Sequence, residues 1–226
     1  MTPLAAGAKL QKPGEEAGYN FHGMKHPTSI SFVRHGEVHN PQDLFYGRLD
    51  GFPLSDLGRQ QALAVGISLK DTPLAALYSS PMLRARQTAE MILDSREGTE
   101  LIVDELINEV KSPYDGIPSS EVEALNWDIY ANVGTGYEQP EDVLARALRF
   151  IRKTLRKHPG KHIVAVTHRD LIVFMFLWYK DRPIGAAEKQ SLNRKFISPG
   201  SISTFTYYSS DLKGGKPEFS YVSPTL

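Results

Sequence analysis

Short apolar segments alternate along the chain with longer segments in which apolar residues recur at helical spacing. Residues 29–33 (SISFV) and 75–80 (AALYSS) are predicted strands, bounded by polar or turn-forming residues. Residues 162–168 (HIVAVTH) form a nearly continuous apolar run, as strands do when both faces of a parallel sheet are covered. Further strands are expected at residues 101–107, 201–208 and 218–222.

Helical spacing predicts helices over residues 54–71, 81–95, 140–157 and 170–179, with a further helix within 119–130. Ser55 is the expected N-cap of the first helix, and Pro81 is expected near the first position of the second. In the first helix the apolar positions are Leu63, Ile67 and Leu69.

The clearest helix covers residues 140–157, which open with Pro140 and two acidic residues and close with basic ones, as the helix dipole favours. Its apolar face is predicted to contain Val143, Leu144, Ala147, Leu148, Ile151 and Leu155.

This alternation predicts an α/β fold, a three-layer αβα sandwich with a mainly parallel central sheet. Ligands of such sheets bind beyond the carboxyl ends of the strands. Residues 28–226 are expected to form the domain. Residues 1–27 are rich in Gly, Pro and Ala, have no periodicity and are expected to be an extension. Its aromatic set of Tyr19, Phe21 and His22 could dock on the domain, and a floppy tail is the alternative.

Net charge, cysteine content and the lack of targeting segments exclude several classes of binding partner and site. Its 226 residues include 26 basic and 26 acidic ones, so no global field attracts nucleic acid or an anionic membrane. The absence of cysteine excludes disulfides, thiolate nucleophiles and cysteine zinc sites. The N-terminal stretch lacks the pattern of a secretory signal, and the apolar run 171–179 is too short to span a bilayer. We therefore expect a cytoplasmic protein.

Polar or ionisable residues follow four of the predicted strands. Arg34 and His35 follow the first, and Ser79 and Ser80 follow the second, with Arg84 one helical turn later. Glu109 and His168 follow two later strands. Parallel strands gather these groups at one edge of the sheet. Two arginines and two imidazoles in one cleft suit a tetrahedral dianion, because the guanidinium fork matches phosphate oxygens.

Four stretches together resemble the histidine phosphatase superfamily, also called phosphoglycerate mutase-like. They are FVRHGEVHN (32–40), GRLDGFPLSDLGRQQA (47–62), YSSPMLRARQTAE (78–90) and AVTH (165–168). The resemblance runs from about residue 29 to about residue 206. It implies that residues 28–226 are a catalytic domain of the phosphoglycerate mutase-like fold.

The resemblance implies a phosphomonoesterase that acts on a small phosphorylated metabolite without a cofactor. His35 would attack phosphorus and become a phosphohistidine, with Arg34, Arg84 and His168 holding the phosphoryl oxygens. Glu109 would be the general acid, with Asp104 and Glu105 as close alternatives. The resemblance also implies substrate contacts at Asn40 and Gly47, with Tyr46 as a neighbour whose role is less defined.

One position departs from the family pattern. Arg169 follows His168 where many members have glycine, so the backbone geometry there becomes costlier or the site gains a cation. We therefore include Arg169 among the candidate substrate-binding residues. Four other basic residues are expected to be solvated at the surface, with an extension of the anion pocket as the alternative: Arg48, Lys189, Arg194 and Lys195. Glu37 could pair with a neighbouring cation or assist proton transfer.

Several alternatives stay open at this point. The spacing of His35 and His39 could suit a metal on a helix, but Gly36 and the preceding strand argue against one, and we expect no metal. A phosphoglycerate mutase-type transferase or a degenerate phosphate-binding member are the other functions. Residues 110–140 contain Lys111 as their only basic residue, which favours hydrolysis. Residues 110–138 are the expected lid. The oligomeric state is open, a homodimer being one option.

Overall fold

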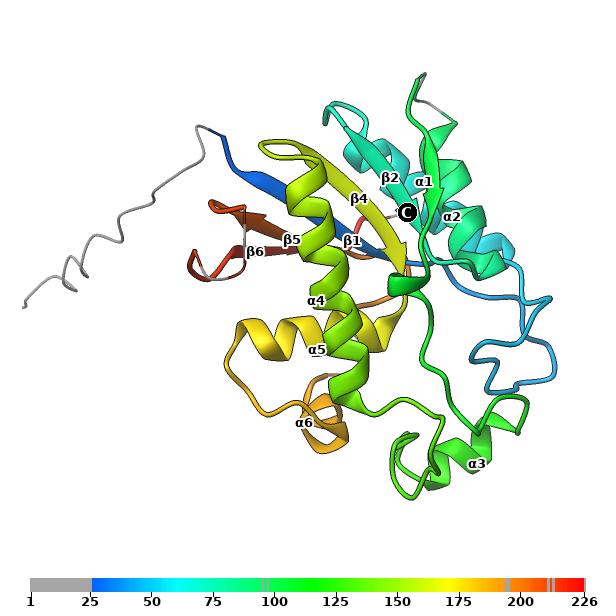
Figure 1. Cartoon of the computed structure of the whole chain (residues 1–226). Helices are drawn as coiled ribbons and strands as arrows, with labels where there is room; N and C mark the ends of the chain where they lie inside the picture. Colours follow the sequence, from blue (N-terminus) through cyan, green and yellow to red (C-terminus); the bar gives the residue numbers. More distant parts are fainter. Residues whose placement is uncertain are drawn as a thin grey trace, which may run out of the picture.

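A six-stranded sheet forms the centre of the computed structural model, which describes residues 26–94, 96, 98–193, 196–210, 212 and 214–225. The strand order is β3-β2-β4-β1-β5-β6 (Figure 1). These strands are β1 (Thr28–Arg34), β2 (Ala76–Ser79), β3 (Leu101–Val103), β4 (His162–Thr167), β5 (Ile202–Tyr207) and β6 (Glu218–Val222). The first four run parallel, while β5 is antiparallel to both β1 and β6. The predicted mainly parallel sheet is confirmed.

Helices cover both faces of this sheet. They are α1 (Asp56–Leu69), α2 (Leu83–Leu93), α3 (Ser119–Ala124), α4 (Pro140–Lys157), α5 (Arg169–Tyr179) and α6 (Ala186–Ser191), with a 3-10 helix η1 (Glu105–Ile107). Side chains of a strand alternate between the two faces. In β1, Ile30 and Phe32 belong to the core under α4 and α5, whereas Val33 packs with α1 and α2. The expected three-layer αβα arrangement is confirmed.

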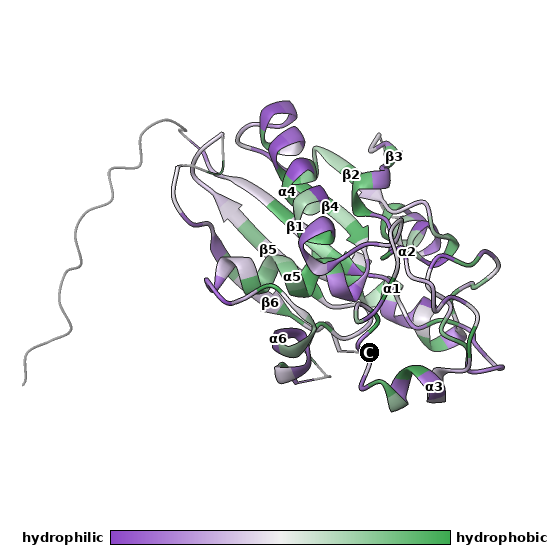
Figure 2. Ribbon diagram, turned by 60° about the horizontal axis from the view of Figure 1, so that its bottom comes forward, coloured by the Kyte–Doolittle hydropathy of each residue, from purple (hydrophilic) through white to green (hydrophobic). Residues whose placement is uncertain are grey.

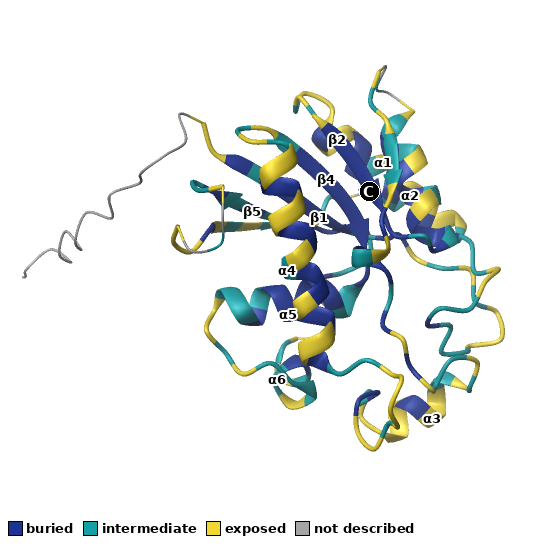
Figure 3. Ribbon diagram, viewed as in Figure 1, coloured by how far each residue is buried: buried dark blue, intermediate teal, exposed yellow. Residues whose placement is uncertain are grey.

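Burial and hydropathy follow these layers. Figure 2 shows hydrophobic residues along β1, β4 and α5 and hydrophilic residues on α4. Figure 3 shows β1, β2 and β4 largely buried and the outer face of α4 exposed. Helix α4 has the predicted bounds, and its first turn is closed by the backbone N–H of Gln139, which donates to Asp142 Oδ2 at 3.0 Å. The predicted face is buried except for Leu148, which is half-buried.

The apolar face predicted for α1 is wrong in part. Ser55 does cap the helix, because its hydroxyl accepts from the N–H of Gly58 at 3.0 Å. However, Leu63 and Ile67 are 47% and 68% exposed, and only Leu69 is buried. The buried side of α1 is made mainly of small residues, since it packs closely on α2 and on the loop after β1.

Three other predicted elements are shorter in the structure. The strand expected at residues 101–107 stops at Val103, because the Asp104 carboxylate accepts from the N–H of Leu106 at 3.0 Å and starts η1. Helix α2 begins at Leu83 rather than beside Pro81. Within 119–130 only residues 119–124 are helical, and Asn126 and Trp127 take left-handed backbone angles.

Most of the predicted N-terminal extension, including its aromatic set, lies outside the described residues. Among the residues that the structure describes, no helix combines the length and apolar character needed to cross a membrane.

Candidate active site

The carboxyl ends of β1 and β4 bring the two predicted histidines together. These strands pair in parallel with Arg34 opposite Thr167, so His35 and His168 leave the sheet side by side. The backbone N–H of His35 donates to the carbonyl of Thr167 at 3.0 Å. The centroids of the two imidazole rings lie 5.2 Å apart, and both residues are buried. Sheet register therefore fixes the distance between the histidines.

Arg84 of α2 joins the groups of the site. It is 1% exposed, and its Nε donates to Nε2 of His35 at 3.3 Å. Its Nη2 donates to the carbonyl oxygen of Gly47 at 2.7 Å and lies 3.3 Å from Oε2 of Glu109. The guanidinium also sits 4.7 Å from the ring centroid of Tyr46. Arg84 is thus a buried member of the site, not a solvated helix arginine.

The ring of His35 has a defined tautomer. Its Nδ1 lies 2.7 Å from the carbonyl oxygen of Gly36, which can only accept, so Nδ1 carries the proton. Burial lowers the pKa of His35 well below 6.5, and the charges of Arg84 and Arg34 lower it further. The imidazole is therefore neutral near pH 7, with the lone pair on Nε2.

Glu109 faces both His168 and Arg84. Its Oε2 lies 3.1 Å from Nδ1 of His168, and its Oε1 accepts from the N–H of Val110 at 2.8 Å. Burial alone would raise the pKa of Glu109, but the contacts with His168 and Arg84 outweigh it and hold this pKa well below 4.5. Glu109 is therefore a carboxylate in the free protein.

His168 is neutral and oriented by its neighbours. Burial lowers the pKa of His168 to about 4 despite the contact with Glu109. Its Nδ1 donates to the carboxylate, and its Nε2 lies 2.7 Å from the hydroxyl of Ser80, which donates to it. Ser80 follows β2, as the sequence pattern indicated.

Three side chains hold the backbone at and just before Glu109. Thr167 Oγ1 donates to the carbonyl of Ile107 at 2.7 Å, which ties η1 to the end of β4. The carbonyl of Glu109 accepts from Arg48 Nε at 2.8 Å and from Arg146 Nη2 at 3.1 Å. These contacts fix the direction in which the Glu109 carboxylate points.

The two alternative acids face elsewhere. Asp104 accepts from Lys153 Nζ at 2.7 Å, and Glu105 accepts from Asn108 at 2.9 Å. Neither residue lines the cavity described below. The geometry thus favours Glu109 over both.

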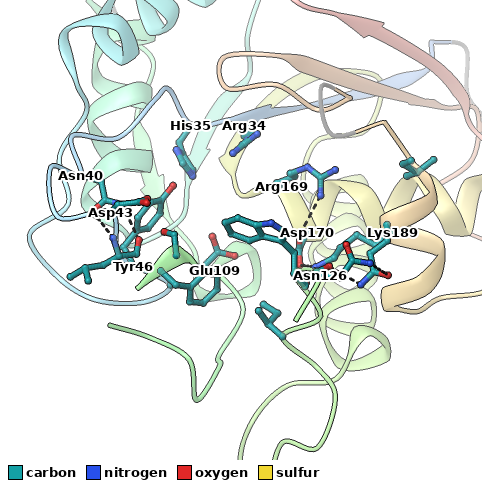
Figure 4. A pocket seen from close by; sticks show the side chains of 18 residues that line it. Arg34, His35, Asn40, Asp43, Tyr46, Glu109, Asn126, Arg169, Asp170 and Lys189 are labelled. Atoms are coloured by element: carbon teal, nitrogen blue, oxygen red, sulfur yellow. Dashed lines mark hydrogen bonds and ion pairs between the residues drawn. The ribbon is translucent and has the colours of Figure 1, made fainter. Parts of the chain in front are cut away.

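A cavity of about 460 Å³ opens in front of these groups (Figure 4). Seven predicted site residues line it: Arg34, His35, Asn40, Tyr46, Gly47, Glu109 and Arg169. Arg84 and His168 lie behind its wall and contact His35 and Glu109. The segment expected as a lid also lines the cavity, through Ser119, Asn126, Trp127 and Ile129.

Asn40 stabilises the loop that carries Tyr46. Its Nδ2 donates to the carbonyl of Leu44 at 2.8 Å, and its Oδ1 accepts from the N–H of Leu44 at 3.1 Å. Both ends of the amide are therefore engaged by the loop.

The solvated-surface interpretation of Lys189 is wrong. Lys189 is 5% exposed, and its Nζ donates to Asp170 Oδ2 at 2.8 Å and to the Trp127 carbonyl at 3.2 Å. Arg48 is half-buried and donates to Glu138 at 2.9 Å. Glu37 accepts from the hydroxyl of Ser55 at 2.8 Å. Arg194 and Lys195 lie outside the described residues.

Arg169 begins α5 with ordinary helical backbone. It is absent from the residues with positive φ, so arginine causes no left-handed strain there. The expected cost in backbone geometry is therefore not observed, whereas the other expectation, an added cation at the site, agrees with the structure.

The site also contains three residues of the types that bind metal ions in proteins. Ligand atoms of His35, Glu109 and His168 lie within 4.8 Å of one another, whereas His39 is exposed and is not part of this set. Arg84 lies 3.3 to 3.4 Å from each of the three. A fixed guanidinium charge repels a second cation and favours an anion, so this donor set suits a phosphoryl group better than a metal.

Sequence reasoning missed the support around Glu109 and Asp170. Arg146 is 5% exposed and donates to Glu138 at 2.7 Å, and Tyr130 donates to Asp170 at 2.6 Å. The burial of Arg146 could have been predicted from the sequence, because this arginine stands among the apolar residues on the inner face of α4.

A model of the histidine phosphatase superfamily (branch 1) matches residues 30–213. The chain belongs to this superfamily. It is 32% identical over 152 residues to Uncharacterized protein Rv0525 of Mycobacterium tuberculosis, covering 65% of this chain and 75% of the relative. It is 29% identical over 143 residues to Uncharacterized phosphatase PhoE of Bacillus subtilis, covering 62% and 72%.

The fold of this superfamily member resembles solved phosphatases. The native structure of mycobacterial glucosyl-3-phosphoglycerate phosphatase Rv2419c superposes with a TM-score of 0.72 at 23% identity. The superposition covers 88% of this chain and 100% of that one. The likeness establishes the phosphoglycerate mutase-like fold that the motifs implied.

Proposed function

We propose that this superfamily member is a phosphomonoesterase that hydrolyses a small phosphorylated metabolite through a phosphohistidine on His35. Residues 28–226 are the proposed catalytic domain. One observation carries the proposal: a buried, neutral imidazole keeps its Nε2 unprotonated, next to the Arg84 guanidinium and near Glu109. A nucleophile, an anion-binding group and a carboxyl group thus meet at one cavity.

In the first step the lone pair on Nε2 of His35 attacks phosphorus and the bond to the leaving oxygen breaks. Arg34 and Arg84 donate hydrogen bonds to the phosphoryl oxygens. The Nδ1–H of His168, which faces Glu109 in the free protein, donates to one of these oxygens once Glu109 has taken up a proton. The negative phosphoryl group raises the pKa of Glu109, which takes the proton of the substrate monoanion and passes it to the leaving oxygen. The Gly36 carbonyl stabilises the positive charge that develops on the His35 ring.

In the second step Glu109 accepts a proton from water while the water oxygen attacks phosphorus. The P–N bond breaks, its electron pair returns to Nε2, and inorganic phosphate leaves. His35 is again neutral with its proton on Nδ1, and the proton taken up by Glu109 can return to the product.

The names of similar proteins support hydrolysis. PhoE is named a phosphatase, and the superposed mycobacterial protein is a glucosyl-3-phosphoglycerate phosphatase. Residues 110–140, which include the lid segment, carry only Lys111 as a basic residue, which offers little for holding a mutase intermediate. We further propose a cytoplasmic location, with a small phosphorylated substrate and neither nucleic acid nor membrane as partner.

The test compares hydrolysis of an aryl phosphate by the wild type and by His35→Ala, with and without excess chelator. We expect activity that chelator leaves unchanged and that His35→Ala reduces by a factor of about 10³ or more. Arg84→Lys should lose most of the activity too, because an ammonium group cannot replace the guanidinium fork. Phosphate binding without turnover in the wild type would identify a degenerate member, and loss of activity in chelator would identify a metal enzyme.

A further inference from the structure

The charged side chains around the cavity are unevenly paired. They are Arg34, Asp43, Glu109, Arg169, Asp170 and Lys189. Asp170 Oδ2 accepts from Lys189 Nζ at 2.8 Å and from the hydroxyl of Tyr130 at 2.6 Å. Glu109 in turn faces Arg84. Each of these two carboxylates therefore has its own cation.

Arg169 has no comparable partner among its described contacts. Its Nη1 lies 3.8 Å from Asp170 Oδ1, which is beyond hydrogen-bond distance, and its side chain is 21% exposed. The other oxygen of Asp170 is already engaged. The Arg169 guanidinium thus borders the cavity with its donors unsatisfied by a close carboxylate.

The positive charges of Arg34 and Arg169 face the same part of the cavity. Burial lowers the pKa of the Arg34 guanidinium, and the charge of Arg169 lowers it further. Figure 4 shows Arg169 on the side of Asp170 and Lys189, with Asp43 across the cavity beside Asn40 and Tyr46. The weakly paired positive charge of Arg34 and Arg169 is therefore concentrated on one wall.

The charge of a bound phosphomonoester accounts for only part of this excess. When Glu109 is protonated to act as the acid, Arg34 and Arg84 supply two positive charges for the two negative charges of the phosphoryl group. The charge of Arg169 is then left over on its wall of the cavity, since Asp43 lies on the opposite wall. A guanidinium at this position suits one more anionic group, and its planar fork matches a carboxylate.

We propose that the substrates are phosphomonoesters whose leaving group carries a carboxylate, and that Arg169 binds this carboxylate. The inference rests on the proposed function, which places the reacting phosphoryl group at His35. It assigns substrate selection to the first residue of α5, a position at which many members of the family have glycine. The lid segment, with Lys111 alone, supplies no equivalent cation at the cavity.

The test uses two esters of primary alcohols, 3-phosphoglycerate and glycerol 3-phosphate, which differ by a carboxylate in place of a hydroxymethyl group. The ratio of their kcat/KM values is measured for the wild type, Arg169→Met and Arg169→Lys. Arg149→Met is the matched control, because it removes the same charge from the exposed face of α4.

We expect the wild type to favour the carboxylate ester, and Arg169→Met to lower the ratio by about 10- to 100-fold, as for the loss of a hydrogen bond between charged groups. Arg169→Lys should keep part of the preference, and Arg149→Met all of it. An unchanged ratio in Arg169→Met, or equal losses on both esters, would overturn the proposal.

The proposed function can fail separately. If the wild type turns over neither these esters nor an aryl phosphate, phosphatase activity is refuted. The ratio is then read from dissociation constants measured by calorimetry with His35→Ala and with His35→Ala/Arg169→Met. A preference for 3-phosphoglycerate that disappears with Arg169 supports carboxylate binding. Equal binding of the two esters by both variants refutes it.

Discussion

The hydrogen bond between Nδ1 of His35 and the carbonyl of Gly36 decides which ring nitrogen can react. Because the carbonyl fixes the proton on Nδ1, the lone pair is on Nε2, next to the guanidinium of Arg84. Burial and the surrounding cations keep this ring unprotonated. A nucleophile in this state needs no separate base to activate it.

The lowered pKa values predict an acidic activity profile. Since the pKa of His35 lies well below 6.5, its protonated form accumulates only below that pH, and the acidic limb of kcat/KM should lie there. Since Glu109 is ionised in the free protein, the leaving-group proton must arrive with the substrate monoanion, whose last pKa is about 6. Activity on alkyl phosphates, whose leaving group needs this proton, should therefore fall as pH rises above about 6. An acidic limb at or above 6.5, measured with an aryl phosphate, contradicts this account.

Glu109→Gln should reveal the general acid through leaving-group dependence. The amide cannot donate a proton as a carboxylic acid does, so alkyl phosphates should lose a factor of about 10² to 10⁴. Nitrophenyl phosphate should lose much less, because its leaving group departs without protonation. Steady-state rates on both esters check this, with Glu105→Gln as the control that keeps wild-type ratios. Equal losses on both esters in Glu109→Gln would show that Glu109 acts otherwise.

At the scale of elements, two glycines let the loop after β1 contact the start of α1. A Cβ on Gly36 would lie 2.3 Å from the carbonyl oxygen of Gly58, and one on Gly58 would lie 2.0 Å from that of Glu37. The N–H of Gly36 also donates to Thr88 of α2 at 3.1 Å. The position of His35 thus depends on a close backbone contact with α1.

Gly58→Ala should therefore disturb both stability and catalysis. Overpacking against backbone costs about 1–3 kcal/mol, which lowers Tm by roughly 2–12 °C in a chain of this size. Gly66→Ala in the same helix is the matched control, since its Cβ would meet atoms no closer than 3.5 Å. That variant should be neutral or more stable, because alanine favours the helix. Thermal melts and kcat measurements on both variants test this prediction. A Gly58→Ala variant with the Tm and kcat of the wild type would disprove the role of the contact.

At the scale of the whole molecule, the parallel sheet explains why the site was visible in the sequence. Residues following β1, β2 and β4 meet at one edge because these strands are neighbours, so local patterns predicted a long-range cluster. The same patterns named Lys189 only as a possible pocket residue, and they did not give Arg146 its place behind Glu109. Those positions depend on how α6 and α4 pack, and no local signal gives the partners of a buried charge.

The end of one strand and the buried face of α1 were predicted wrongly, and both errors have local causes that periodicity does not detect. An Asp104 side chain that accepts from Leu106 ends one strand early. In α1, close packing of small residues turns Leu63 and Ile67 outward, against the expectation that large apolar residues are buried.

The most direct test of the central claim is to identify the residue that carries the phosphoryl group. The protein is mixed with a labelled phosphomonoester and quenched during turnover, and the label is mapped to a peptide. The account predicts label on His35 that is stable in alkali, lost in acid and absent from His35→Ala. Label on a serine, or none while turnover continues, would contradict it.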